Sequence, residues 1–167
     1  AVGSLREEIG RGHFVVLDQF LDFTRHRATT FFDRFEIGLM KHTPMATPFD
    51  SKLRKIFTEA CHELGFPCHE KGTVVTIEGP RFSTRAESHM FSYWDADVIN
   101  MTTAPECILA NEAEIPYAVI AMSTDYDCWN EDEEPVSWEA VLKTFQENVS
   151  RVTDLLQHVI SRVYSEA

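Results

Sequence analysis

The sequence predicts an α/β fold, in which a central β-sheet is flanked by helices. Runs of β-branched and apolar residues predict buried strands, most clearly at residues 73–77 and 117–124. Apolar residues at helical spacing predict amphipathic helices before, between and after these strands. Glycine and proline separate the segments. We therefore expect residues 1–167 to form a single α/β domain.

The charge of the chain excludes two classes of partner. Fifteen basic and 27 acidic residues give a formal net charge of −12. Nucleic acids and anionic membranes bind positively charged surfaces, so neither is expected as a partner. No apolar run approaches the ~18 residues of a membrane span, and no signal peptide is recognised. We expect a cytoplasmic protein.

The cysteines agree with a reducing compartment. Cys61, Cys68, Cys107 and Cys128 show no Cys-x-x-Cys spacing. Reduced thiols are the expected state, and a disulfide framework or a zinc site is the alternative.

The first fifty residues contain one predicted strand and a long irregular segment. Residues 1–9 are predicted as a turn and a short helical stretch, and residues 12–20 as one buried strand. Residues 21–41 are predicted as a surface loop, which either packs on another subunit or is simply solvated. Residues 42–49 should be extended, because two prolines restrict the residues before them.

Two helices have clear boundaries in the sequence. Asp50 or Ser51 can cap the first, and Gly65 ends it. Ser137 can cap a long final helix. The predicted buried face of the first helix is formed by Leu53, Ile56, Phe57, Ala60, Cys61 and Leu64. That of the final helix is formed by Val141, Leu142, Phe145, Val149, Val152, Leu155, Leu156, Val159 and Ile160.

The central stretch, residues 72–102, indicates where a ligand would bind. A strand at 73–77 is broken by Gly79-Pro80, a helix is predicted at 84–94, and a short strand follows at 97–99. A further helix, with proline in its first turn, is predicted at 105–113. Ligands of open α/β sheets gather beyond the carboxyl ends of strands. Residues 78–83, 100–102 and 125–127 follow such ends, so they form one candidate site.

These motifs resemble the purine nucleoside phosphorylase family. The resemblance rests on residues 76–88, on residues 96–103 and on Pro105-Glu106, and it extends from residue 3 to about residue 156. Within the family the chain looks most like the branch that acts on 5′-methylthioadenosine. The resemblance implies a mixed central sheet that is incomplete at the N-terminus, and a homotrimeric pentosyltransferase.

The implied reaction is phosphorolysis of 5′-methylthioadenosine to adenine and 5-methylthioribose-1-phosphate, in purine and methionine salvage. Inorganic phosphate would be the co-substrate, with no other cofactor and no metal. The alternatives are a general or 6-oxopurine nucleoside phosphorylase, and a truncated, non-catalytic remnant that binds purine.

For the purine base, the resemblance implies that Phe82 packs on the ring, with Ser83 beside it. Asp125 and Asp127 would be the catalytic residues at the edge of the base, because a carboxylate accepts from a 6-amino group and can exchange a proton with the ring. The residues alone leave a solvated turn or a metal-holding Asp-x-Asp open. The calcium-loop pattern fails, because its glycine is absent and Trp129 occupies a ligand position.

For the sugar and the phosphate, the resemblance implies Met101 under the ribose, with Asn100 ordering the turn and Thr124 among the substrate contacts. Thr102 and Ala1 match phosphate-binding positions. Filling of the core is the alternative role for Met101.

For the 5′ substituent, Val136, Trp138 and Val141 match the positions that line the methylthio pocket. His42 matches a residue donated across a subunit interface, although a lone histidine also serves structural roles. Trp138 is larger than the apolar residue usual in the family. Asp95 and Glu114 replace glycine after helices, and each would strain a left-handed cap by ~1 kcal/mol.

The largest departure from the family is length. The resemblance implies an upstream half with most of the phosphate ligands and the first strands of the sheet. We expect the chain to be the C-terminal portion of a longer chain, or to be complemented by an N-terminal fragment. A truncated relative without activity is the alternative.

Overall fold

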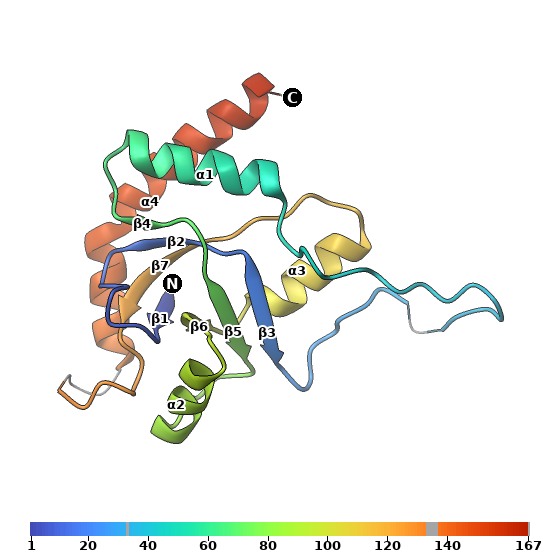
Figure 1. The fold of residues 1–167 in the computed structure, drawn as a ribbon, viewed down its shortest axis with the longest axis horizontal. Coiled ribbons are helices and arrows are strands. Elements are labelled where there is room, and N and C mark those ends of the chain that lie inside the picture. Colours follow the sequence, from blue (N-terminus) through green and yellow to red (C-terminus); the bar gives the residue numbers. More distant parts are fainter. Residues whose placement is uncertain (33, 133–136, 167) are drawn as a thin grey trace.

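The computed structural model describes residues 1–32, 34–132 and 137–166 and contains a mixed sheet with helices packed around it (Figure 1). The strands are β1 (Val2–Ser4), β2 (Phe14–Val16), β3 (Gln19–Phe23), β4 (Cys68–His69), β5 (Thr73–Ile77), β6 (Val98–Asn100) and β7 (Ile120–Asp125). The helices are α1 (Ser51–Glu63), α2 (Arg85–Tyr93), α3 (Thr103–Glu112) and α4 (Trp138–Glu166). The order of the seven strands is β3-β5-β6-β1-β7-β2-β4. The predicted mixed α/β architecture is confirmed.

The direction of the strands changes at β1. Strands β3, β5 and β6 are parallel to one another. Strand β1 is antiparallel to β6, with Gly3 opposite Ile99, and parallel to β7, with Gly3 opposite Asp125. Strand β7 therefore runs against β5 and β6, and the short β1 is the only strand between β7 and β6 in the described sheet.

The core consists of three apolar clusters that cover both faces of the sheet. One lies between strands β2 and β7 and helices α1 and α4, with Phe14, Ala60 and Leu155 fully buried. A second joins the opposite face of β2 to α3. The third joins β5 and β6 to α2 through Phe91. Successive residues of β5, Val74 and Val75, enter different clusters, as expected of a strand buried on both faces.

Local signals place the ends of α1, α2 and α4 close to where the sequence predicts them, whereas α3 begins at Thr103, two residues before its predicted start. The side chain of Asp50 accepts a hydrogen bond from the Leu53 amide at 2.8 Å, and Gly65 adopts a positive φ of 65° after the helix. Thr84 and Glu87 form a reciprocal capping box on α2. The Ser137 hydroxyl accepts from the Ala140 amide at 3.2 Å, which caps α4.

The N-terminal predictions need three corrections. Residues 2–4 form a strand rather than a turn with a helical stretch, because their hydrogen bonds go to β6 and β7, far along the chain. Residues 12–20 form parts of two strands. The break is fixed by Arg54, which donates to the Leu17 carbonyl, and by Asp18, whose carboxylate accepts from the Gly72 amide. The loop predicted at 21–41 begins after Phe23, where β3 ends.

The predicted apolar face of α4 is wider than the part that this chain buries. Leu155 and Val159 are buried against α1 and the sheet, and Phe145 and Val152 are partly buried. The expectation that the remaining positions are buried is wrong for four residues, because they lie beyond the edge of α4 that contacts α1 and the sheet. The exposed residues are Leu142, Val149, Leu156 and Ile160. No helix in the described part of the chain combines the length and hydropathy that a membrane span requires.

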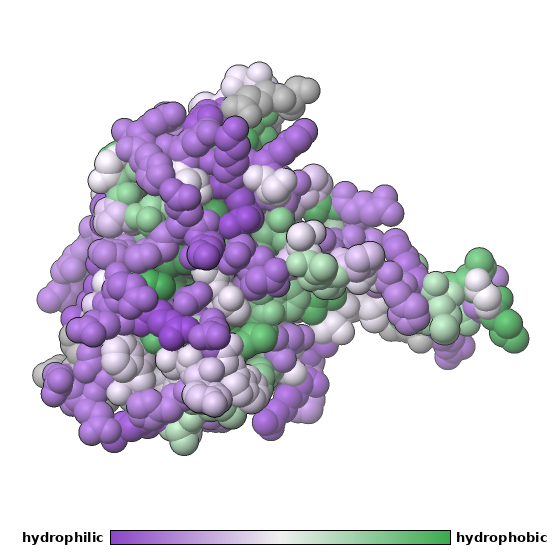
Figure 2. All heavy atoms as spheres, viewed as in Figure 1, coloured by the Kyte–Doolittle hydropathy of each residue, from purple (hydrophilic) through white to green (hydrophobic). Residues whose placement is uncertain are grey.

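Residues 24–48, which we call the arm, leave the body of the molecule as a long irregular segment (Figure 1). The arm is tied to α3, because the Glu112 carboxylate accepts from the Phe31 amide and the Thr30 hydroxyl at 2.6 and 2.8 Å. Apolar side chains gather at its end (Figure 2). Those that are exposed are Phe31, Phe32, Phe35, Ile37, Leu39 and Met40.

Candidate active site

A cavity of about 270 Å³ lies where β5, β6, β7 and β1 meet the start of α4. This volume is close to the lower end of the ~300–1,000 Å³ of small-molecule pockets. The cavity is lined by Ala1, Val2, Gly3, Ile77, Phe82, Ser83, Ile99, Asn100, Met101, Thr102, Thr124, Asp125, Asp127, Trp138 and Val141. Residues predicted for the base, the sugar, the phosphate and the 5′ substituent therefore come together.

Two predicted site residues are not part of this set. His42 is exposed on the arm and does not line the cavity of this chain. Val136 lies outside the described residues.

The carboxylates reach the cavity for a reason that the sequence did not supply. We expected residues 125–127 and 100–102 to meet because both follow the carboxyl ends of strands, but β7 and β6 are antiparallel. They meet across Gly3 of β1. A Cβ on Gly3 would lie 3.0 Å from Asp125 Oδ1 and 3.0 Å from the Ile99 side chain. Glycine thus leaves the space between β6 and the Asp125 carboxylate open.

Asp125 is held in one orientation by two short hydrogen bonds. Its Oδ1 accepts from the Asp127 amide at 2.9 Å, and its Oδ2 accepts from the Thr124 hydroxyl at 2.7 Å. Burial raises the pKa of the Asp125 carboxyl above its usual value, although these two hydrogen bonds oppose the shift. Each oxygen keeps acceptor capacity for a ligand.

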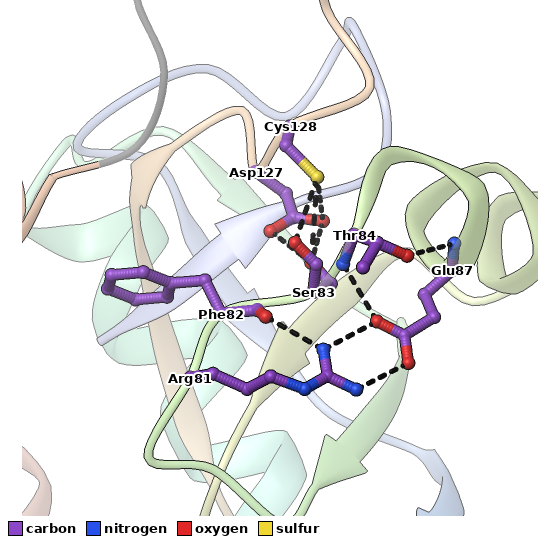
Figure 3. Close-up of polar contacts among 7 residues, drawn as sticks. All are labelled: Arg81, Phe82, Ser83, Thr84, Glu87, Asp127 and Cys128. Carbon is purple, nitrogen blue, oxygen red and sulfur yellow. Dashed lines mark hydrogen bonds and ion pairs between the residues drawn. The ribbon is translucent and has the colours of Figure 1, made fainter.

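Asp127 is more deeply buried than Asp125, and its carboxylate is held by Ser83. Only 6 % of its surface is exposed, and its backbone has a positive φ of 48°. The Ser83 hydroxyl donates to both carboxylate oxygens of Asp127, at 2.7 and 2.6 Å. The Cys128 thiol donates to the Ser83 carbonyl at 3.3 Å (Figure 3). The Asp127 carboxylate therefore holds Ser83 beside the cavity.

Phe82 is positioned by an ion pair outside the cavity (Figure 3). The Arg81 guanidinium donates to both carboxylate oxygens of Glu87 at 2.7 Å and to the Phe82 carbonyl at 3.0 Å. Glu87 also accepts from the Thr84 amide at 2.7 Å. The bonds from Arg81 and Thr84 lower the pKa of the Glu87 carboxyl to about 2. The Phe82 ring points away from this pair (Figure 3) and lines the cavity.

The end of β6 forms another wall of the cavity. The Thr76 hydroxyl donates to Asn100 Oδ1 at 2.9 Å, and Asn100 Nδ2 donates to the Thr103 hydroxyl at 2.6 Å. These bonds order the turn that carries Met101 and Thr102. The Met101 sulfur packs against Gly79, where a Cβ would lie 2.6 Å from it. Glycine at position 79 thus allows the two walls to touch.

The sequence did not point to the apolar floor of the cavity. The missed lining residues are Val2, Gly3, Ile77 and Ile99. A glycine within a strand signals the close approach of another group, but residues 1–9 were not predicted as a strand, so this signal was missed at Gly3. Among the residues that the structure describes, no three His, Cys, Asp or Glu side chains converge as ligands for a metal ion.

Comparisons with known proteins agree with this geometry. Residues 1–161 match the family described as the phosphorylase superfamily. The chain is 54 % identical over 165 residues to S-methyl-5′-thioadenosine phosphorylase of Xenopus tropicalis and 53 % identical to that of Danio rerio, covering 98 % of this chain and 59 % of each relative. The chain thus spans less than two thirds of the length of these curated relatives.

Solved structures show the same relationship. An adenosine/methylthioadenosine phosphorylase mutant from Schistosoma mansoni in complex with adenine has a TM-score of 0.94 and 38 % identity, covering 100 % of this chain and 65 % of that one. A further mutant of the same enzyme, in complex with methylthioadenosine, has a TM-score of 0.91, 38 % identity, and coverage of 99 % and 63 %. The chain belongs to the phosphorylase superfamily.

Proposed function

We propose that the protein containing this chain catalyses the phosphorolysis of 5′-methylthioadenosine, which yields adenine and 5-methylthioribose-1-phosphate. The observation that carries the proposal is the partly buried Asp125 carboxyl, with its raised pKa, in a cavity that also contains Phe82 and Met101. The names of the relatives and the ligands of the Schistosoma mansoni structures support the same substrate.

At the base, Phe82 packs on the purine ring, and the carboxylates meet its edge. Asp125 accepts from the 6-amino group and, with its raised pKa, donates a proton to the departing ring nitrogen. Asp127 and Ser83 act as a fixed pair, since they already bond to each other. The ring nitrogen becomes more basic as the glycosidic bond breaks, so this proton transfer lowers the barrier.

At the sugar, catalysis rests on positioning and electrostatics. Positive charge develops on the ribose as the base departs. Met101 supports the ribose, and Thr102 and Ala1 contribute to binding the phosphate that attacks the anomeric carbon. The 5′ substituent lies against Trp138 and Val141, with Val136 as the third residue of that pocket.

The remaining parts of the site come from outside these 167 residues. We propose that further phosphate ligands are supplied by a longer chain or a complementing fragment, since the chain spans 59 % of the Xenopus relative. We also propose a cytoplasmic homotrimer, in which the arm brings His42 to the 5′ pocket of a neighbouring subunit. Inorganic phosphate is the co-substrate. The reaction is a step of purine and methionine salvage and uses no other cofactor.

The test is the release of adenine from 5′-methylthioadenosine in the presence of phosphate. The isolated chain should be inactive, and activity should return when the unmatched part of the Xenopus relative is supplied, either fused or co-expressed. Adenosine and inosine serve as comparison substrates, which detect a general or a 6-oxopurine phosphorylase. Turnover by the isolated chain would contradict the requirement for further residues, and a folded but inactive assembly would contradict the proposed reaction.

A further inference from the structure

One contact network, at the root of the arm, joins the two walls of the cavity. We call residues 78–83 the base wall and residues 100–102 the sugar wall. The guanidinium of Arg27 lies between them. Its Nη2 donates to the Glu78 carbonyl at 2.8 Å, and its Nη1 donates to the Met101 carbonyl at 3.0 Å. One planar group thus binds the main chain at the end of β5 and just beyond β6.

The side chain of Glu78 fixes the guanidinium from a third direction. Glu78 Oε1 accepts from Arg27 Nε at 3.2 Å, and Oε2 accepts from the Arg25 and His26 amides at 2.6 and 3.3 Å. These amide bonds, followed by the bonds from Arg27, lower the pKa of the Glu78 carboxyl, so it stays ionised at neutral pH. The carboxylate therefore ties the root of the arm to the base wall.

We infer that Arg27 is a positioning residue, which sets the spacing between the base wall and the sugar wall. The inference deepens the proposed function and rests on it. Arg27 does not line the cavity, so it acts through the backbone of Glu78 and Met101. Arginine suits this role, because its fork of donors reaches two carbonyls at once, whereas lysine offers a single compact ammonium.

The position of Arg27 predicts an effect that differs between two ligands. Adenine contacts the base wall, whereas 5′-methylthioadenosine spans both walls. Loss of the bridge should therefore weaken binding of the nucleoside more than binding of the base. A general loss of folding would weaken both to the same extent, so the ratio of the two affinities separates positioning from stability.

The experiment compares Arg27→Ala with Arg25→Ala in the assembly that binds nucleoside. Both substitutions remove one positive charge. Arg25 is exposed and binds Glu78 only through its backbone amide in the contacts described above, and Arg25→Ala retains that amide. Affinities for adenine and 5′-methylthioadenosine are measured by calorimetry. Arg27→Ala should weaken nucleoside binding about tenfold, by the usual energy of a charge-assisted hydrogen bond, with a smaller effect on adenine. Arg27→Lys should recover part of the loss, and Arg25→Ala should match the wild type.

A second measurement needs no ligand and is independent of the proposed function. The 167-residue chain is labelled with methyl-¹³C methionine, and the NMR signal of the Met101 methyl group is assigned as the one that is missing from Met101→Leu. This signal should shift in Arg27→Ala and stay in place in Arg25→Ala. The signal of Met122, buried in β7, reports on the fold. If the wild type binds neither ligand, the proposed function fails and this signal alone decides on Arg27. An unmoved Met101 signal, an equal loss for both ligands, or the same effect in Arg25→Ala would overturn the inference.

Discussion

The corner of the cavity formed by Ser83, Thr124, Asp125 and Asp127 contrasts with the arm. In the corner, both carboxylates are oriented by hydrogen bonds of 2.6–2.9 Å from this chain. The arm is tied to the body near Phe31 by Glu112, while Ile37 beyond it is fully exposed. The chain thus orients the two carboxylates by itself, whereas the apolar end of the arm is exposed in the described part of the chain.

The largest expected effect concerns the corner. With its proton directed at the ring nitrogen, Asp125 offers only an acceptor to the 6-position, so it should bind the amino group of adenine and repel the carbonyl oxygen of hypoxanthine. Asp125→Asn offers a donor in nearly the same volume. The wild type should prefer 5′-methylthioadenosine over 5′-methylthioinosine by at least about 100-fold, because the carbonyl would set two acceptors against each other in a closed site. Asp125→Asn should reduce this preference at least about tenfold. The measurement is the ratio of kcat/KM values in the active assembly.

Asp127→Asn is the matched control for that experiment. Asp127 already accepts twice from Ser83, so its loss should lower turnover more than it changes selectivity. An unchanged preference in an active Asp125→Asn enzyme would show that Asp125 does not read the 6-position. Base recognition would then rest on Phe82 and its surroundings.

The second effect concerns the arm. Ile37 is fully exposed in the single chain, so Ile37→Asp should change the free energy of unfolding by less than about 0.5 kcal/mol. If the arm packs on a neighbouring subunit, a buried unpaired carboxylate should weaken association at least about tenfold. Sedimentation velocity measures this, with Ile37→Val as the conservative control. Unchanged association of Ile37→Asp would place the end of the arm outside the interface.

Features that depend on neighbouring residues could be predicted from the sequence. Helix ends depend on neighbouring residues, so Asp50, as one of two candidates, and Ser137 were identified as caps from the sequence alone. The strand at 73–77 was also predicted with its observed limits, because its β-branched run is long and uninterrupted. The grouping of Phe82, Asp125 and their neighbours followed from motifs with a family resemblance.

What the sequence left open depends on distant contacts. Strand β1 has three residues, and its hydrogen-bond partners lie about a hundred positions away, so no local pattern marks it. Strand β2 and the start of β3 were predicted as one strand, and they separate where Arg54 and Gly72 bind the chain between them. The bridge from Arg27 to Met101 crosses 74 positions and has no local signature.

The proposed 5′ pocket would join the two regions, because Trp138 lies on this chain and His42 is proposed to come from a neighbouring subunit. Trp138 is 63 % exposed at the start of α4 and lines the cavity. Trp138→Val should enlarge the pocket and raise kcat/KM for longer 5′-alkylthio analogues by up to about tenfold, within the usual range per methylene. Val141→Ala serves as a comparison at another residue that lines the cavity. A fall for all analogues alike would indicate that Trp138 supports the fold instead.

A smaller effect concerns the ion pair behind Phe82. The folded pKa of Glu87 is about 2, below the ordinary value of 4.5, so its contribution to stability is present above pH 4.5 and is lost as the pH falls toward 2. Glu87→Gln should lower the free energy of unfolding at pH 7 by about 1 kcal/mol or less, as for an exposed ion pair. Urea titrations between pH 2 and 7 should show the difference disappearing at low pH. A difference that is constant with pH would assign the effect to the helix cap alone.

An effect of similar size is expected at the end of α3, which carries the Glu112 anchor of the arm. Glu114 follows that helix with a positive φ of 58°, and Asp95 follows α2 with a φ of 59°, as predicted for residues that replace glycine. Glu114→Gly should raise the free energy of unfolding by ~1 kcal/mol, because glycine adopts this backbone without strain. For a chain of this size the melting temperature should rise by about 2–4 °C. Glu114→Ala removes the same charge but keeps the Cβ, so it should give no gain. Equal stabilisation by alanine and glycine would assign the effect to the loss of the carboxylate and not to the backbone. The chain already carries a formal charge of −12, so removal of one negative charge would reduce repulsion.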